Sequence, residues 1–295
     1  MTDEVRSVVK WGDSQQYLSA PIKKNEDSSD SSGITVALLS ATDDPLGAIA
    51  AACRMYKGIP TYSLSDINDI ERYDYLKQVM KTNLKAPFEF VDFHFFIEGV
   101  DRSFTHQMVR QRTAVFAQES LRFAVKESFS DEVVPPPSVA GLAADHPWRV
   151  IWNNTLNSVQ DGYEQLVNGG MPAEEARGLL PHCVPTRLNY HTNLRNLQEH
   201  LGNRLCTQAQ HHWKIVAAKM VQAIRKHSND YAVLAADAFK PVCYLTGKCE
   251  FNAEFDRHCS IRERVNKHHQ SGEPSTSWSD IHPSEWLENP GAARL

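Results

Sequence analysis

The chain has 295 residues, of which 41% are hydrophobic and 23% are charged, and its formal net charge is −5. These values lie near the globular average, so the chain can bury a sizeable core in one large domain or two small ones. A negatively charged chain has no global positive field for binding phosphates, which disfavours a partner that is DNA or RNA. A small anionic substrate is still compatible, because a few local arginines suffice to bind it.

No apolar run reaches the about 18–20 residues that a membrane span requires, and the N-terminus lacks the apolar stretch of a signal peptide. We therefore expect a cytoplasmic location with no membrane partner. In a reducing cytosol the six cysteines are expected to be thiols.

Composition divides the chain into three parts. Residues 21–33 are polar and rich in Ser and Asp, which predicts that the N-terminal segment 1–33 is disordered or loosely attached. The C-terminal tail, 266–295, is similarly polar, and we expect most of it to be disordered. The part between them, 34–265, is predicted to be the folded domain.

The first elements of this domain follow from local patterns. Residues 34–41 have the β-branched and apolar content of a strand. A helix is expected over 45–56, with Thr42 or Asp43 as its N-cap. Apolar residues at spacings of three and four predict a further helix over 63–84.

A strong strand pattern follows. Apolar and polar residues alternate over 88–99, and Gly99 is expected to end the strand. One face of the strand is apolar: Val91, Phe93, Phe95 and Ile97. Asp101 can then cap a helix that runs through residue 112.

The second half of the domain is predicted to be mainly helical. A helix over 148–168 should end at Gly169, and a short helix should follow Pro172. The longest helix is expected to begin near Thr192 and to run for about 30 residues on one apolar stripe. The irregular alternation of strands and helices predicts an α+β or mixed α/β fold, with one sheet covered by long helices.

A cluster of cations stands between the two halves. Three arginines and one serine fall within 110–123: Arg110, Arg112, Ser120 and Arg122. Guanidinium groups match phosphate oxygens in geometry and never lose their charge, so the cluster predicts a phosphate-binding loop. The alternative is a set of solvated arginines paired with Glu119 and Glu127.

The spacing of this cluster resembles the signature of flavin-dependent thymidylate synthases, which usually reads Arg-His-Arg, seven residues, Ser-x-Arg. Here Arg110-Gln111-Arg112 and Ser120-Leu121-Arg122 stand in that register. Further blocks are similar to the family's and occur in the same order: LLSATDDPL (38–46), Pro87-Phe88-Glu89-Phe90, ARGLLP (176–181), Asn193-Leu194-Arg195 and NRLCTQAQ (203–210). The resemblance covers about 34–225.

The resemblance implies that 34–265 is a catalytic domain with the family's fold, built on one central, mainly antiparallel sheet. It implies an FAD-dependent methyltransferase that converts dUMP to dTMP. The carbon donor would be 5,10-methylenetetrahydrofolate and the reductant NADPH. It also implies a homotetramer whose active sites are shared between subunits.

The resemblance also assigns roles to residues. The implied dUMP contacts are Gln107, Arg110, Gln118, Ser120, Leu121, Arg122, Arg177 and Arg204. The implied FAD contacts are Ala86, Arg110, Gln111, Arg112, Gln118, Asn193, Arg195 and Glu199. Arg204 is the implied catalytic residue, because a permanent cation beside the uracil stabilises the negative charge that develops there.

Each role has a plainer alternative. Arg204 could instead pair with Glu199 on the outside of its helix, and Arg177 and Arg195 could be surface residues. Asn193 is an ordinary N-cap candidate in any protein.

The chain departs from the family pattern at several positions. Gln111 replaces the usual His, which removes a group that titrates near pH 7. Leu84, Phe90, Gln118 and His212 also stand where the family usually has another residue. The arginines expected at phosphate and uracil are kept, so the expectation for dUMP is firmer than the details for flavin.

The cysteines do not follow a known pattern. Cys206, close to Arg204, is interpreted as a core thiol. Cys243, Cys249, Cys259 and His258 could form a structural zinc site, but they lack the short paired spacing of a zinc knuckle. No metal site is therefore predicted.

Two other functions remain open from the sequence. The first is a dUMP hydroxymethylase on the same scaffold, which would keep the dUMP arginines and alter the flavin contacts. The second is a non-enzymatic nucleotide- or RNA-binding module, and the negative net charge argues against its RNA form.

Overall fold

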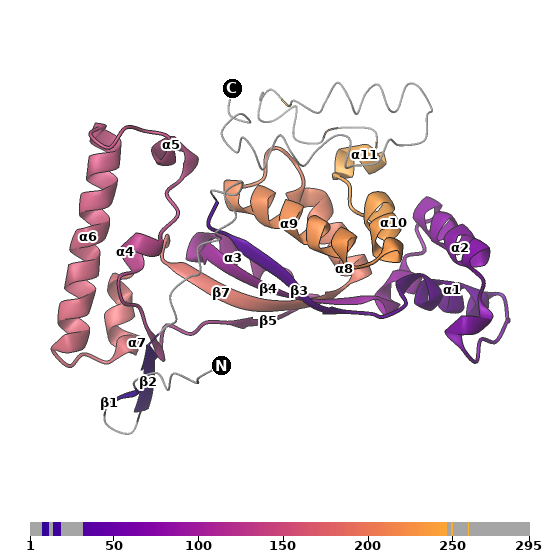
Figure 1. The fold of residues 1–295 in the computed structure, drawn as a ribbon, viewed down its shortest axis with the longest axis horizontal. Coiled ribbons are helices and arrows are strands. Elements are labelled where there is room, and N and C mark those ends of the chain that lie inside the picture. The colour runs from indigo at the N-terminus through magenta and orange to yellow at the C-terminus, as the bar shows by residue number, and fades with distance from the viewer. Residues whose placement is uncertain (1–7, 12–13, 19–31, 247–248, 250–258, 260–295) are drawn as a thin grey trace. The chain divides into compact units, whose positions relative to one another are not determined.

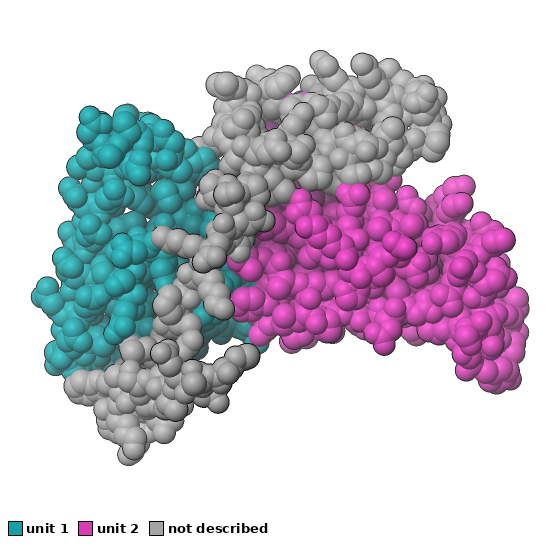
Figure 2. Space-filling view, in the orientation of Figure 1, with its two compact units in different colours: residues 1–34, 97–110, 117–188 teal, residues 35–96, 111–116, 189–295 magenta. Residues whose placement is uncertain are grey.

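The computed structural model describes residues 8–11, 14–18, 32–246, 249 and 259 (Figure 1). The chain divides into two compact units that interleave along the sequence, coloured teal and magenta in Figure 2. Unit 1 comprises 1–34, 97–110 and 117–188, and unit 2 comprises 35–96, 111–116 and 189–295.

A four-stranded sheet has the order β3-β4-β7-β5. Its strands are β3 (Thr35–Ala41), β4 (Asp92–Asp101), β7 (Pro185–Asn193) and β5 (Val115–Gln118). Backbone hydrogen bonds connect the end of one strand to the beginning of its neighbour: Thr42 N to Asp92 O (3.2 Å), Leu194 N to Val91 O (2.7 Å) and Glu119 N to Arg187 O (3.0 Å). This pattern is antiparallel, so the predicted α+β class with one mainly antiparallel sheet is confirmed.

Unit 2 places its helices beside this sheet (Figure 1). They are α1 (Pro45–Tyr56), α2 (Asp69–Lys81), α8 (Leu194–Arg204), α9 (His211–His227), α10 (Asn229–Ala238) and α11 (Val242–Thr246), with the 3-10 turns η1 (Leu64–Asp66) and η2 (Ala86–Phe90). Helix α9 packs against β3 and α10. The alternation predicted for β4 holds, because Phe93 and Phe95 are fully buried in this core.

Unit 1 contains the remaining helices. They are α3 (Arg102–Met108), α4 (Phe129–Glu132), α5 (Pro137–Ala140), α6 (Pro147–Asn168) and α7 (Ala173–Ala176), followed by the 3-10 turn η3 (Arg177–Leu179). Tyr163 of α6 is fully buried in a small core with Val125 and Ala176. Gly169 ends α6 and Pro172 precedes α7, as the sequence predicts.

Unit 1 also contains a second, small sheet of order β1-β2-β6. Strands β1 (Val8–Trp11) and β2 (Ser14–Leu18) pair antiparallel, and β2 pairs parallel with β6 (Ala124–Val125). This hairpin lies inside the segment 1–33 and was not anticipated from the sequence. The three predicted domain boundaries stay predictions.

The predicted helix of about 30 residues from Thr192 is wrong in length. It is divided into α8 and α9 by a turn over 205–210, in which Ala209 N donates to Cys206 O at 3.0 Å. Gly202 and Asn203 are weak helix formers near the end of α8. The apolar stripe continues across the turn because Leu205 stays buried, which is why its periodicity hides the break.

Three smaller expectations also need correction. The N-cap of α1 is Asp44, whose carboxylate accepts from Gly47 N at 2.7 Å. The helix expected over 63–84 is split into η1 and α2. The helix capped by Asp101 ends at Met108, before the arginine cluster.

Gly99 does not end its strand, because β4 continues to Asp101. Its φ is +78°, and a Cβ atom there would lie 2.2 Å from the carbonyl oxygen of Gly33. Glycine is required here by close backbone approach rather than as a strand terminator. Within the part of the chain that the structure describes, no helix is long and apolar enough to cross a membrane.

Candidate functional site

The predicted phosphate-binding loop is a tight turn that follows β5. The carbonyl of Ser120 accepts from Phe123 N at 3.1 Å and from Ala124 N at 2.9 Å, and its hydroxyl accepts from Arg122 N at 3.3 Å. This turn leaves the side chains of Ser120 and Arg122 exposed. A hydroxyl and a guanidinium are thereby presented to solvent within three residues.

Two of the predicted phosphate arginines meet at one glutamate in unit 1. Arg122 Nε lies 3.0 Å from Glu174 Oε2, and Arg177 Nε donates to the carbonyl of Glu174 at 3.0 Å. The carboxylate partner of Arg122 is therefore Glu174, from α7, rather than the Glu119 or Glu127 of the surface alternative. The two arginines come together within one chain, without a second subunit.

The other predicted dUMP residues of unit 1 differ in their surroundings. Gln107 lies in α3, and Arg110 is exposed just after it. The amide nitrogen of Gln118 donates to the hydroxyl of Thr105 at 2.9 Å, so this side chain is held against α3. Leu121 packs against a buried cluster around Phe129, which is a structural contact.

A buried group of charges lies directly behind the turn, and sequence reasoning missed it. Lys126 Nζ lies 2.7 Å from Glu119 Oε2, and the Lys126 side chain is only 1% exposed. Arg187 Nε lies 3.4 Å from Glu98 and 3.9 Å from Glu119. Burial lowers the pKa of Lys126, and Glu119 opposes that change. Glu119 stands between Gln118 and Ser120, so this network fixes the backbone that presents Ser120.

In unit 2, the segment that carries Gln111 is attached to the start of α8. Gln111 donates to Asn196 O at 3.3 Å and accepts from the hydroxyl of Tyr190 at 2.7 Å. Asn196 in turn donates to Thr113 O at 3.1 Å. Asn193 caps α8 by accepting from Asn196 N at 3.0 Å, so its N-cap alternative is confirmed.

A cavity of about 330 Å³ in unit 2 brings together part of the predicted FAD set. Its walls come from α8, α11 and the residue before η2: Lys85, Arg195, Gln198, Glu199, Gly202, Asn203 and Val242. Arg195 and Glu199 are predicted FAD contacts, and Ala86 adjoins Lys85. Arg195 forms an exposed ion pair with Glu89 of η2. Arg112 is exposed and does not line this cavity.

Arg204 ends α8 above an aromatic ring. Its guanidinium carbon lies 4.7 Å from the ring centroid of Trp213 on α9, and burial lowers its pKa. The ring of His200 approaches Trp213 edge-on at 4.8 Å. Burial and the charge of Arg204 lower the pKa of His200 to about 4, so the imidazole is neutral near pH 7. A cation–π contact of this kind holds the guanidinium against the ring.

The sequence of the chain matches a known family. Residues 37–228 match the sequence profile of the thymidylate synthase complementing protein family. The chain belongs to this family. A flavin-dependent thymidylate synthase of Geobacter sulfurreducens is 30% identical over 219 residues, which cover 72% of this chain and 90% of that protein.

Two solved structures have the same fold as this chain. A UMP/dUMP methylase from Streptomyces cacaoi bound with 5-Br dUMP has a TM-score of 0.54 at 22% identity, covering 70% of this chain and 95% of that one. A flavin-dependent thymidylate synthase of Helicobacter pylori complexed with FAD and dUMP has a TM-score of 0.52 at 17% identity, covering 70% and 99%. The fold expected from the resemblance is thus confirmed.

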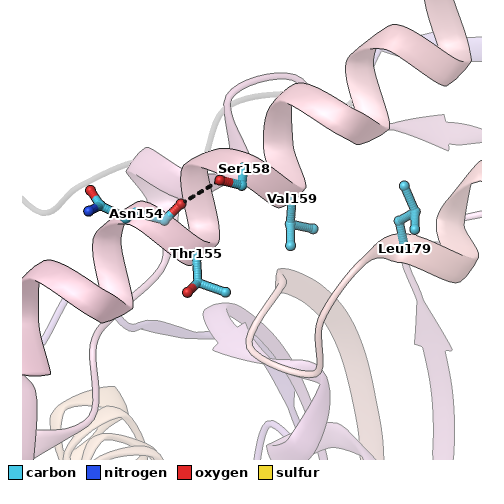
Figure 3. Close-up of a pocket in the computed structure, with 5 residues that line it drawn as sticks. All are labelled: Asn154, Thr155, Ser158, Val159 and Leu179. Atoms are coloured by element: carbon cyan, nitrogen blue, oxygen red, sulfur yellow. Dashed lines mark hydrogen bonds between the residues drawn. The ribbon is translucent and has the colours of Figure 1, made fainter.

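A second cavity in this family member is lined by none of the predicted site residues, although Leu179 on its wall lies in the same turn, η3, as Arg177. It has about 400 Å³ and is lined in unit 1 by Asn154, Thr155, Ser158, Val159 and Leu179 (Figure 3). The hydroxyl of Ser158 donates to the carbonyl of Asn154 at 2.9 Å, within α6. None of the five lining side chains is charged, so this cavity has nothing to neutralise a phosphate.

The neutral state of His200 gives a pH prediction. The pKa of His200 is about 4 in the folded chain and about 6.5 in the unfolded chain. The contribution of the neutral ring to the free energy of unfolding is therefore fully present above pH 6.5 and is lost as the pH falls toward 4. We expect the wild type to lose roughly 2–3 kcal/mol more unfolding free energy than His200→Gln between pH 7.5 and 4.5. Urea unfolding of both proteins at the two pH values measures this, and equal losses would contradict it.

Proposed function

We infer that the chain is a flavin-dependent thymidylate synthase that methylates dUMP to dTMP. The observation that carries this inference is the exposed cationic cluster of Ser120, Arg122 and Arg177, found in a chain whose family and named relatives are thymidylate synthases. The ion pair of Arg122 with Glu174 is exposed on both sides, and such pairs contribute only about 0–1 kcal/mol. A phosphate dianion can therefore replace the carboxylate of Glu174 at little cost.

The residues around the cavity in unit 2 fit part of FAD. The Arg195 guanidinium and the Asn203 amide supply donors of the kind that a diphosphate or a flavin ring accepts. About 330 Å³ holds only a portion of such a large molecule. Reduced FAD held there would supply the hydride for the methyl group.

In this reaction the residues of the chain bind and orient the substrate and polarise its uracil ring. We propose that Arg204 lies beside the uracil and stabilises its anionic form, which makes C5 a carbon nucleophile without a protein nucleophile. The cation–π contact with Trp213, 4.7 Å from the guanidinium carbon to the ring centroid, holds Arg204 at this place. His200 is neutral at pH 7, so it adds no second cation that would disturb the orientation of Arg204.

Several finer parts of the function stay proposals. We propose 5,10-methylenetetrahydrofolate as the carbon donor, NADPH as the reductant and a cytoplasmic location. We also propose a homotetramer with active sites that combine residues from several subunits. These proposals rest on the resemblance to the family.

The product decides between the proposed activity and its alternatives. The purified chain would be incubated with FAD, dUMP, 5,10-methylenetetrahydrofolate and NADPH. The nucleotides would then be separated and their masses measured by mass spectrometry. A product of the mass of dTMP supports methylation. The mass of 5-hydroxymethyl-dUMP would instead identify a hydroxymethylase. Failure to bind FAD, with no shift of flavin absorbance on addition of dUMP, would indicate a non-enzymatic nucleotide-binding module.

The cluster at Glu174 predicts opposite effects of two substitutions. Arg122→Ala removes a charged hydrogen-bond donor and is expected to weaken dUMP binding by roughly 10- to 100-fold. Glu174→Ala, the matched control, frees Arg122 and is expected to leave dUMP binding unchanged or tighter. Calorimetric titration with dUMP measures both. Deoxyuridine, which lacks the phosphate, should show no loss with Arg122→Ala, and an equal loss for both ligands would contradict a phosphate contact.

A further inference from the structure

Gln111 lies in a short segment, 111–116, that belongs to unit 2 although the residues on both sides of it belong to unit 1. Its side chain uses both ends of its amide. Tyr190 donates its hydroxyl hydrogen to Gln111 Oε1 at 2.7 Å, and Gln111 Nε2 donates to the carbonyl of Asn196 at 3.3 Å. A backbone carbonyl can only accept, so the nitrogen of the amide must face Asn196 and the oxygen must face Tyr190. One side chain thereby connects β7 to the first turn of α8.

Two further contacts hold the same segment. The side-chain nitrogen of Asn196 donates to the carbonyl of Thr113 at 3.1 Å. The ring of Phe116 stacks on the ring of Tyr190, with 5.3 Å between the centroids. Tyr190 is fully buried, and burial raises the pKa of its hydroxyl, which therefore stays protonated and can donate. The segment 111–116 is thus attached along its length to β7 and α8.

The first turn of α8 carries residues of the predicted FAD set. Asn193 caps the helix by accepting from Asn196 N at 3.0 Å, so the residue that Gln111 holds is also the residue that the cap holds. Arg195 directly precedes Asn196 and lines the cavity of about 330 Å³. The hydrogen bond from Gln111 to the Asn196 carbonyl therefore acts on the part of the helix that presents Arg195 to the cavity.

We propose that Gln111 is a positioning residue, which fixes the first turn of α8 for FAD in place of the direct FAD contact that the resemblance implies. This inference rests on the proposed function, in which Asn193 and Arg195 bind FAD. Both ends of the Gln111 amide are engaged within the chain, so turning either end toward a ligand would break a bond to Tyr190 or to Asn196. A side chain held in this way orients a binding group without touching the ligand.

Binding of FAD by five proteins tests the proposal: the wild type, Gln111→Met, Tyr190→Phe, the double variant of these two, and Tyr231→Phe. Methionine has about the length of glutamine without its hydrogen bonds. Phenylalanine keeps the stacked ring of Tyr190 and removes only the hydroxyl. Tyr231 is the matched control, because it is fully buried in unit 2 and its hydroxyl also donates at 2.7 Å, but to the carbonyl of Thr42.

The dissociation constant of FAD, measured by flavin fluorescence, should rise in a set order. We expect a rise of roughly 5-fold for Tyr190→Phe and of roughly 10- to 30-fold for Gln111→Met, because these variants lose one and two hydrogen bonds of the attachment. The double variant should bind FAD as Gln111→Met does, since the Tyr190 hydroxyl acts through Gln111. Tyr231→Phe should stay within about twofold of the wild type.

Two results of this titration would overturn the proposal. Normal FAD binding by Tyr190→Phe together with weak binding by Gln111→Met would mean that the Gln111 side chain contacts FAD itself. A further loss in the double variant would mean that Tyr190 and Gln111 act separately.

A second measurement needs no ligand. Hydrogen–deuterium exchange would be followed by mass spectrometry in peptides that contain 111–116 and 194–198. Their amides should exchange at least about fivefold faster in Gln111→Met and Tyr190→Phe than in the wild type, and Tyr231→Phe should match the wild type. Equal exchange in all of these proteins would overturn the proposal. Failure of the wild type to bind FAD would instead contradict the proposed function, and amide exchange would still decide whether Gln111 holds α8.

Discussion

Arg204→Ala is expected to lower kcat for dTMP formation by about 10²–10³, the usual cost of removing one donor that stabilises a developing oxyanion. In the structure this guanidinium lies over Trp213 with its pKa lowered by burial, yet an arginine stays charged at any working pH. The substitution therefore removes a positive charge that stabilises the transition state. Steady-state rates at saturating dUMP, with product identified by mass, measure the effect.

Arg204→Lys is the matched control for this prediction. Lysine keeps the positive charge but lacks the planar fork that stacks on an indole, so we expect an intermediate rate. The thermal unfolding midpoint of both variants should stay close to that of the wild type, since the side chain is half-exposed at the end of α8. Normal turnover by Arg204→Ala would remove Arg204 from the proposed mechanism.

Helices and strands that carry a local sequence pattern, such as a capping residue or alternating apolar residues, could be predicted from the sequence. The helix predicted over 45–56 is α1 to the residue, because Pro45 and an N-terminal carboxylate define where it starts. The strand with alternating apolar residues is β4, and its apolar face is fully buried. Local periodicity decides such elements, and tertiary contacts do not override it.

The break between α8 and α9 shows where periodicity fails. Leu201, Leu205 and Trp213 keep helical spacing and are all fully buried, although Leu205 begins the turn that separates the helix of Leu201 from the helix of Trp213. A turn that preserves the direction of an apolar stripe leaves no trace in that stripe.

In the candidate site, too, the contacts between residues close in the sequence could be predicted, whereas those between distant residues could not. The spacing of Ser120 and Arg122 predicts a phosphate-binding loop, because residues two apart in one turn necessarily lie close together. Nothing local indicates that Glu174, more than 50 residues later, lies between Arg122 and Arg177. The buried pair of Glu119 and Lys126 has the composition of an ordinary surface charge run, and only packing shows that it is buried.

That buried pair gives the largest expected effect on stability. Lys126→Met removes a buried cation 2.7 Å from Glu119 and leaves that carboxylate in a poorly solvated place. Breaking one side of a buried pair costs about 3–5 kcal/mol, and we expect about 3 kcal/mol because Arg187 still lies 3.9 Å from Glu119. Urea unfolding measures this, and exposed Lys77→Met, the control, should change stability by less than about 0.5 kcal/mol.

The double variant separates pairing from packing. Lys126→Met combined with Glu119→Gln removes both charges, so it should recover most of the stability lost by Lys126→Met alone. No recovery would mean that Lys126 stabilises the fold through its hydrocarbon chain or through other partners. If stability recovers but the double variant binds dUMP more weakly than the wild type, the charges serve to hold Ser120 and its turn in place. The network would then be retained for the phosphate site rather than for the fold, at the expense of two buried ions.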